Sequence, residues 1–119
     1  MTTTSHSEFD CAEFVCAVLD WLDGREEPIE SLDEAFELLA HTRRRLFLEV
    51  MRTYDEQLTL PDAAEEVAVR ESGRSVADLS AERVANVYIS LYHDHLPRLV
   101  DAGLVEYDQE RDLVSPAVI

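Results

Sequence analysis

Lysine is absent from this sequence. All ten basic residues are arginine, and they stand against 26 acidic residues, which gives a formal net charge of −16. A lysine-free acidic surface is typical of proteins from salt-saturated cells, because carboxylates bind water and hydrated cations while molar salt screens their repulsion. The alternative is a surface that imitates nucleic acid or binds a basic partner. Because the acidic residues are spread along the whole chain, we favour adaptation to a halophilic cytoplasm.

Glycine and long apolar runs are also scarce. Only Gly24, Gly73 and Gly103 occur, which excludes a glycine-rich phosphate loop. The apolar runs are too short for a membrane-spanning helix, so no membrane association is expected. The first ten residues lack the basic and apolar regions of a secretory signal, and we expect a cytoplasmic protein. With 46% apolar residues among 119, a globular domain with a modest core is expected.

Cysteine occurs only twice, as Cys11 and Cys16. Residues five apart on a helix lie about 140° apart around its axis, so these two neither pair nor share a metal easily. We expect both to be small buried thiols in the core.

Residues typical of catalysis or cofactor binding are lacking as well. Ser90 and His93 are three apart, but no third group orients them and no oxyanion donor is evident, so we expect no enzyme. His93 and His95 fall on different faces of a helix, which argues against a shared metal. His95 is expected to be a hydrogen-bonded core residue. We therefore expect no cofactor and no metal site.

Helical periodicity is the main pattern that the sequence does contain. Ser31, with Glu34 three residues on, is expected to form a capping box. Thr42 and Ser80 are expected to be N-caps, and Pro61 fits a first helical turn. The expected helices cover residues 8–22, 32–40, 43–54, 61–71 and 81–102.

Short strands are expected between and after the helices. Residues 57–60 have the pattern of one short strand, and residues 104–107 and 112–115 form a hairpin around the four-residue loop "DQER". Gly103 is placed as the left-handed stop after the last helix. Pro97 lies inside that helix and is expected to kink it.

The order of these elements predicts the fold class. Three helices, a short strand, a helix, a long helix and a hairpin describe a winged helix-turn-helix domain, mainly α with a small β-hairpin wing. The first of the three helices is extra to that fold. We expect residues 1–30 to form an N-terminal tail, helix and linker, and residues 31–116 to form the winged helix-turn-helix domain.

Two segments resemble a known family. "LLAHTRRRLFLEVM" (38–51) and "HLPRLVDAGLVE" (95–106) resemble parts of the ArsR-like winged-helix regulators. Together with "YISLYHDHLPRLVDAGLVEYD" (88–108), the pattern is most similar to a haloarchaeal family of small winged-helix proteins known mainly as a domain of unknown function. The resemblance covers residues 31–115 and implies a winged-helix fold and DNA-binding regulation.

DNA binding by so acidic a chain depends on where the arginines lie. Residues 43–83 hold seven of the ten arginines and nine acidic residues, so this part is nearly balanced. Residues 43–45 are three arginines at one helix N-terminus. Either Glu34, Glu37 or Glu49 pairs with them, or one or two of them reach phosphates.

The exposed stripe of the last helix offers groups for base contacts. Asn86 suits adenine, Ser90 suits either base type, and His93 can donate to a phosphate or a guanine edge. Arg74 and Arg83 flank the loop before this helix, and Arg111 is the only basic residue at an acidic wing tip. The expected DNA-contacting residues are therefore Arg43, Arg44, Arg45, Arg74, Arg83, Asn86, Ser90, His93 and Arg111.

The first helix has more apolar surface than a solvent-facing helix needs. Its side chains either pack on the same domain or form a dimer interface, and we favour the dimer because palindromic operators call for two-fold proteins. The expected interface residues are Phe9, Phe14, Val18, Trp21 and Leu22.

These patterns lead to one expected function and one alternative. We expect a DNA-binding transcriptional regulator of a halophilic archaeon, with double-stranded DNA and a second copy of the chain as its partners. The alternative is a protein–protein interaction module that uses the winged-helix fold without binding DNA.

Overall fold

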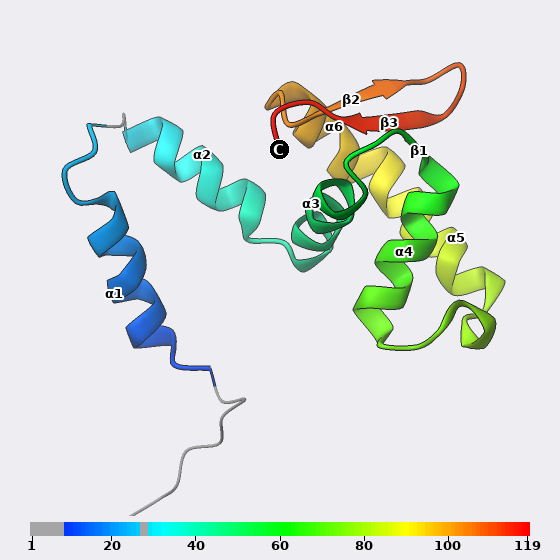
Figure 1. Cartoon of the computed structure of the whole chain (residues 1–119), viewed down its shortest axis with the longest axis horizontal. Coiled ribbons are helices and arrows are strands. Elements are labelled where there is room, and N and C mark those ends of the chain that lie inside the picture. Colours follow the sequence, from blue (N-terminus) through cyan, green and yellow to red (C-terminus); the bar gives the residue numbers. More distant parts are fainter. Residues whose placement is uncertain (1–8, 27–28) are drawn as a thin grey trace, which may run out of the picture. The chain divides into compact units, whose positions relative to one another are not determined.

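The computed structural model describes residues 9–26 and 29–119. The chain divides into two compact units, Met1–Leu32 and Asp33–Ile119. Helix α1 (Cys11–Leu22) belongs to the first unit, and helix α2 (Ile29–Leu39) spans the boundary (Figure 1). The predicted domain boundary between residues 30 and 31 stays a prediction.

Helix α1 begins where the sequence provides an acceptor for its free N–H groups. Asp10 is the N-cap, and its carboxylate accepts a 3.0 Å hydrogen bond from the backbone N–H of Glu13. No residue of α1 is buried. Cys11 and Cys16 are exposed, so the prediction of buried thiols was wrong. A unit of this length has too few apolar residues to enclose them in a core of its own.

Two predicted caps were wrong because their helices begin earlier. Helix α2 starts at Ile29, so Ser31 lies within its first turn and forms no capping box with Glu34. Helix α3 (Thr42–Tyr54) has His41 as its N-cap residue, which leaves Thr42 as its first helical residue.

The second unit has the predicted order of elements. Helix α3 is followed by β1 (Leu58–Thr59), α4 (Leu60–Ser72), a 3₁₀ turn (Val76–Asp78) and α5 (Ala81–Ser90). The predicted N-cap Ser80 is confirmed: its hydroxyl accepts a 3.1 Å hydrogen bond from the N–H of Arg83. Pro61 lies in the first turn of α4, as expected.

The long last helix is interrupted by a π-helical turn. Helix α5 passes through this turn (Leu91–His95) into α6 (Leu96–Asp101). The N–H of Leu96 donates to the carbonyl of Leu91, five residues back. Pro97 follows directly and has no N–H to donate to the preceding turn. The expected kink at Pro97 therefore takes the form of a wider helical turn.

The wing is a small antiparallel sheet with strand order β1-β3-β2. Strands β2 (Val105–Asp108) and β3 (Leu113–Pro116) form the predicted hairpin, and Thr59 of β1 pairs with Leu113. Gly103 has φ +79°, so it is the left-handed helix stop that was expected. The hairpin loop is residues 109–112, one residue later than predicted, because Asp108 still pairs with Leu113.

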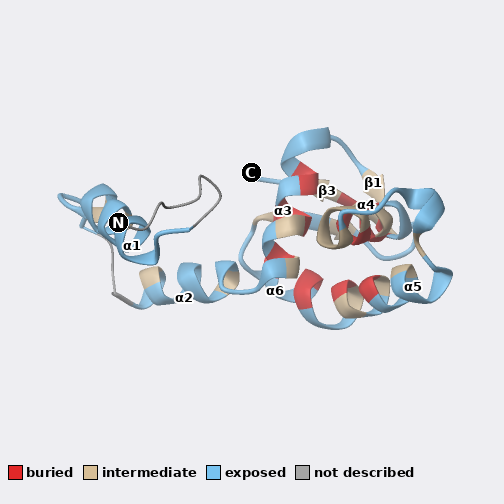
Figure 2. Cartoon of the chain, turned by 90° about the horizontal axis from the view of Figure 1, so that it is seen from below, coloured by how far each residue is buried: buried red, intermediate tan, exposed pale blue. Residues whose placement is uncertain are grey.

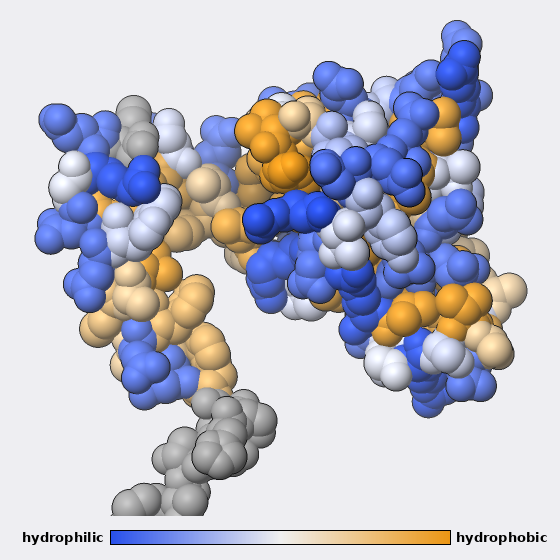
Figure 3. All heavy atoms as spheres, in the orientation of Figure 1, coloured by the Kyte–Doolittle hydropathy of each residue, from blue (hydrophilic) through white to orange (hydrophobic). Residues whose placement is uncertain are grey.

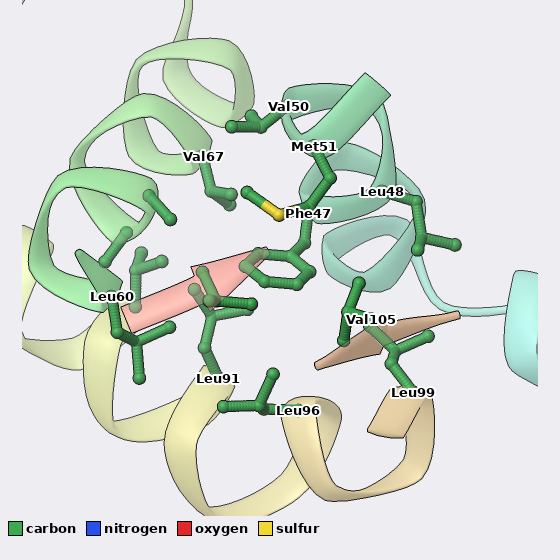
Figure 4. Close-up of a cluster of buried hydrophobic side chains, with 14 of the residues drawn as sticks. Phe47, Leu48, Val50, Met51, Leu60, Val67, Leu91, Leu96, Leu99 and Val105 are labelled. Atoms are coloured by element: carbon green, nitrogen blue, oxygen red, sulfur yellow. The ribbon is translucent and has the colours of Figure 1, made fainter. Parts of the chain in front are cut away.

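The core lies between α3, α4, the long last helix and the sheet (Figures 2 and 4). Phe47 of α3 is completely buried and lies among side chains from all of these elements. Helix α4 contributes the small buried residues Ala63, Ala64 and Ala68, which lets it pack closely on its neighbours. The fold class is confirmed as mainly α with a small β wing, the winged helix-turn-helix arrangement. The buried hydrophobic residues are Phe47, Leu48, Val50, Met51, Leu60, Ala63, Ala64, Val67, Ala68, Val87, Leu91, Leu96, Leu99, Val105 and Val114.

Candidate nucleic-acid interface

One face of α5 and of the π-helical turn after it, called the α5 face, carries polar side chains that the core does not use. Val87 and Leu91 point into the core, while Arg83, Asn86 and His93 are exposed and Ser90 is half-buried along the opposite stripe. Arg83 is the third residue of α5, in the first turn after the N-cap Ser80. The structure therefore places the predicted base-contacting residues on one helix face.

A hollow lies at the N-terminal end of this face. It has a volume of about 680 Å³, and its lining includes the exposed side chains of Arg74, Arg83 and Asn86. Glu82 and Asp78 line it too, so its charge is mixed. Two of the predicted phosphate contacts thus flank the same end of α5.

Arg43 and Arg83 share one carboxylate. Arg43 donates from Nε and Nη2 to the two carboxylate oxygens of Glu71, over 2.8 and 2.7 Å, and Arg83 Nη2 lies 3.3 Å from the same Oε1. The hydrogen bond from Arg43 holds the pKa of Glu71 below its ordinary value, and both arginine charges add to this effect. The cluster carries one net positive charge, on the side where Arg83 reaches solvent.

The three consecutive arginines therefore have separate structural roles. Arg44 is only 6% exposed, and its Nε and Nη1 have no hydrogen-bond partner among the described residues. Arg45 donates to Thr42 Oγ1 and to the carbonyl of Leu39. The bond to Leu39 caps the C-terminal end of α2. The burial of Arg44 argues against a phosphate contact, and its predicted role in DNA binding stays a prediction.

The acidic partners proposed for these arginines were wrong. Glu71 of α4 pairs with Arg43, and Glu49 pairs instead with Arg70 over 2.7 Å. Partners 28 and 21 residues apart in sequence meet because α3 packs against α4. Local spacing along one helix contains no signal for such pairs.

The wing loop is tied to α5 by the carboxylate of Asp112. Asp112 accepts a 2.8 Å hydrogen bond from Tyr88 Oη and a second bond from Tyr107 Oη. The bond to Asp112 raises the pKa of Tyr88, and burial together with the same bond raises that of Tyr107. Asp112 has φ +55°, a backbone conformation that aspartate tolerates better than most residues.

The wing tip itself offers little to a polyanion. Arg111 is exposed, but its Nε lies 3.9 Å from Asp108 Oδ2, and Glu110 is exposed beside it. Gln109 Nε2 donates to Tyr92 Oη over 3.1 Å, which adds a second link between the loop and the long helix.

An apolar groove of about 620 Å³ lies on the other side of α5. Hydrophobic atoms gather over the connection between α4 and α5, at lower right in Figure 3. Val76 and Ile89 are about half exposed there, at 47% and 53%. The lining residues are Pro61, Glu65, Val76, Leu79, Ser80, Ala81, Val84, Ala85, Tyr88 and Ile89.

The predicted dimer-interface residues lie in the first unit. Phe14 and Trp21 are 55% and 63% exposed, and the Arg25 guanidinium lies 3.8 Å from the centre of the Trp21 ring. Val18 and Leu22 are partly buried. Phe9 packs its ring against that of Phe14, with 5.6 Å between the ring centres.

The fold and the free face of its long helix define the class of protein as a winged helix-turn-helix domain. Within this class, residues 36–115 match a family described as a domain of unknown function, DUF7344, and the chain belongs to that family. No curated protein and no solved structure matches the chain. Among the described residues, no helix has the length and apolar character needed to cross a membrane.

Proposed function

We propose that this protein is a transcription regulator that binds double-stranded DNA through the exposed face of α5. The observation that carries the proposal is the separation of faces on this helix. Val87 and Leu91 anchor it in the core, while Arg83, Asn86 and His93 are exposed on the opposite side, Arg83 with one bond to Glu71. A helix held in this way by a three-helix core presents its N-terminal half to a major groove.

The N-terminal end of α5 suits a phosphate. Free backbone N–H groups and the helix dipole favour an anion there, and Arg74 and Arg83 lie beside the same end. Further along the face, Asn86 can bond to adenine, and Ser90 and His93 can bond to base edges or phosphates. Arg43 supports the site indirectly by holding Glu71, which in turn positions Arg83.

The acidic surface fits a regulator that works in molar salt. The attraction between arginines and phosphates through counterion release is weak at such salt, so binding depends on shape, hydrogen bonds and water. The absence of lysine among ten basic residues supports a halophilic archaeal cytoplasm as the setting. The resemblance of residues 38–51 and 95–106 to ArsR-like regulators supports the same function.

The regulator acts as a dimer in this proposal. Phe14, Val18 and Trp21 follow one another at four- and three-residue spacing, so they form one apolar stripe along α1. Such a stripe on each of two chains can form a two-fold interface, and this matches the symmetry of palindromic operators.

Selection of bound fragments from random DNA at molar KCl tests the proposal. The wild-type protein should recover one motif, and Arg83→Ala or Asn86→Ala should weaken its binding about fivefold or more, since a good base or phosphate contact contributes about 1–3 kcal/mol. Arg52→Ala is the matched control, because Arg52 is an exposed arginine on α3. Arg43→Glu and Arg44→Glu are unsuitable, because these side chains are tied to the fold.

Failure to recover any motif at molar KCl contradicts the regulator. Equal weakening by Arg52→Ala and Arg83→Ala would contradict the assignment of the α5 face, because it would show a general charge effect.

A protein-interaction module is the second candidate, and the apolar groove beside α5 favours it. A peptide or helix with apolar side chains could bury Val76, Leu79 and Ile89 there. In this case Ile89→Glu abolishes copurification of one stoichiometric protein partner, while Asn86→Ala does not. Recovery of a DNA motif that is insensitive to Ile89→Glu argues against the module.

A further inference from the structure

Two histidines and an aspartate from distant segments meet beside the far end of the α5 face, where Ser90 lines the same hollow. His41 precedes α3, whereas Asp94 and His95 lie in the π-helical turn. One ligand atom from each of the three lies within 4.8 Å of the other two. The rings of His41 and His95 are 4.6 Å apart, centre to centre.

His95 is the buried member of this group and has an unused ring nitrogen. Its side chain is 2% exposed, and Nδ1 has no hydrogen-bond partner among residues 9–26 and 29–119. The nearest carboxylate oxygen, Asp94 Oδ2, lies 3.8 Å from Nδ1, too far for a hydrogen bond. The expectation of a hydrogen-bonded core histidine was thus right in its burial and wrong in its bonding. A buried polar atom without a partner is costly unless something binds it.

Asp94 is already oriented for a ligand. Its Oδ1 accepts a 3.0 Å hydrogen bond from Arg98 Nε, which leaves Oδ2 free toward His95. A second partner of this kind commonly fixes a metal-binding carboxylate. A hollow of about 480 Å³ is lined by His41, Asp94 and His95, so it gives an ion and its water access to the group.

We propose that His41, Asp94 and His95 bind one divalent first-row transition metal ion, with Zn²⁺ as the type. Two imidazoles and one carboxylate are a ligand set that Zn²⁺ takes, with the fourth position open to water. At metal–ligand distances of about 2.1 Å, tetrahedral ligands lie roughly 3.4 Å apart. His41 and Asp94 are exposed, so rotation of their side chains can close the remaining distance.

The charges around the group favour its metal-binding forms. The bond from Arg98 lowers the pKa of Asp94, and burial lowers that of His95, so a carboxylate and a neutral imidazole are present at neutral pH. Arg44 acts in the same direction on both. The charge of Arg43, which would repel a cation, is offset by its pair with Glu71.

Metal titration of the full chain tests this site directly and does not depend on DNA binding. We would use Cys11→Ser/Cys16→Ser as the background, because both thiols are exposed and bind Zn²⁺ themselves. Molar KCl with excess Mg²⁺ occupies the surface carboxylates. Calorimetry with Zn²⁺ should then give one ion per chain, and Co²⁺ should give the visible bands of a tetrahedral site.

Substitutions identify the ligands. His41→Ala and Asp94→Asn should each lower the affinity about tenfold or more, and Arg98→Ala about tenfold through loss of the bond to Asp94. His93→Ala is the matched control, because His93 is the exposed neighbour of Asp94 and lies outside the group. If the buried-ligand variant His95→Gln does not fold, the affinities of His41→Ala and Asp94→Asn decide whether the site exists.

Two outcomes would overturn the site. The first is the absence of saturable Zn²⁺ binding by the folded background protein. The second is equal affinity of the His41→Ala and His93→Ala variants, which would place the ion elsewhere.

Discussion

Tyr88 of α5 and Asp112 of the wing loop are joined by a 2.8 Å hydrogen bond between the tyrosine hydroxyl and Oδ2. Tyr107 of β2 donates to the other oxygen of the same carboxylate. One side chain thus holds the wing against the helix that we propose reads DNA. The wing loop is acidic in composition, yet this acidic residue has a structural role.

The first prediction concerns this link. Asp112→Ala leaves both tyrosine hydroxyls without an acceptor and should lower the free energy of unfolding by about 2 kcal/mol. Tyr88→Phe removes one bond only and should cost about 1 kcal/mol. Urea unfolding followed by circular dichroism measures both. Asp112→Asn is a useful comparison, because asparagine also tolerates the left-handed backbone conformation. A change below the error of the measurement for Asp112→Ala would contradict the structural role.

The second prediction concerns Glu71, which holds Arg43 and Arg83. Glu71→Gln should lower the free energy of unfolding by about 1 kcal/mol, because a partly buried charge-assisted pair is lost. The pKa of Glu71 is lowered in the folded chain, so its contribution is present above pH 4.5 and is lost as the pH falls below that value. Glu49→Gln is the control: the Glu49 side chain is 62% exposed against 19% for Glu71, and its loss should change stability little.

The third prediction concerns alkaline pH. The pKa values of Tyr88 and Tyr107 are raised in the folded chain above the ordinary value of 10.0. Their contribution to stability is therefore complete below pH 10 and is lost as the pH rises above it. The double variant Tyr88→Phe/Tyr107→Phe should lose less stability than the wild type between pH 9 and about 11. Thermal unfolding against pH measures this, with Tyr92→Phe as a control that leaves Asp112 bonded.

The fourth prediction concerns salt. A net charge of −16 on 119 residues produces strong self-repulsion, which is screened as the Debye length falls from about 10 Å at 0.1 M to about 3 Å at 1 M salt. The unfolding temperature should rise steadily with KCl over this range. Sucrose at equal osmolality is the control for water activity. A rise of the same size in sucrose would show that screening is not the cause.

The fifth prediction concerns the proposed dimer. Light scattering at molar KCl should give about twice 13.5 kDa for the wild type. Phe14→Glu or Trp21→Glu places a charge in the apolar stripe of α1 and should yield the monomer mass. Ala12→Glu adds the same charge roughly 160° around the helix from Phe14 and should remain dimeric. A wild-type mass of 13.5 kDa would refute the dimer.

Much of the fold could be predicted because its signals are local. Apolar spacing placed the helices, and the Ser80 cap, Pro61 and Gly103 placed several of their ends. The π-helical turn was less accessible. Pro97 indicates a disturbance in the long helix, but packing of Leu91 and Leu96 in the core determines the form it takes.

The candidate interface could be predicted only in part. Asn86 and Ser90 share a face because α-helical spacing places them there, and the exposed His93 follows in the π-helical turn. The three arginines at 43–45 form one run in sequence, yet they have three different environments in the structure. Arg43 pairs with α4, Arg44 is buried, and Arg45 caps α2.

The sequence by itself determined the helices, the wing, the acidic lysine-free surface and the polar stripe of α5, because composition and short-range periodicity encode them. Only the tertiary structure decided that Asp112 holds the wing, that Glu71 holds two arginines, and that His41 meets His95. Each of these contacts joins residues far apart in sequence. Such contacts depend on how helices pack, and the spacing of residues along one element does not specify that packing.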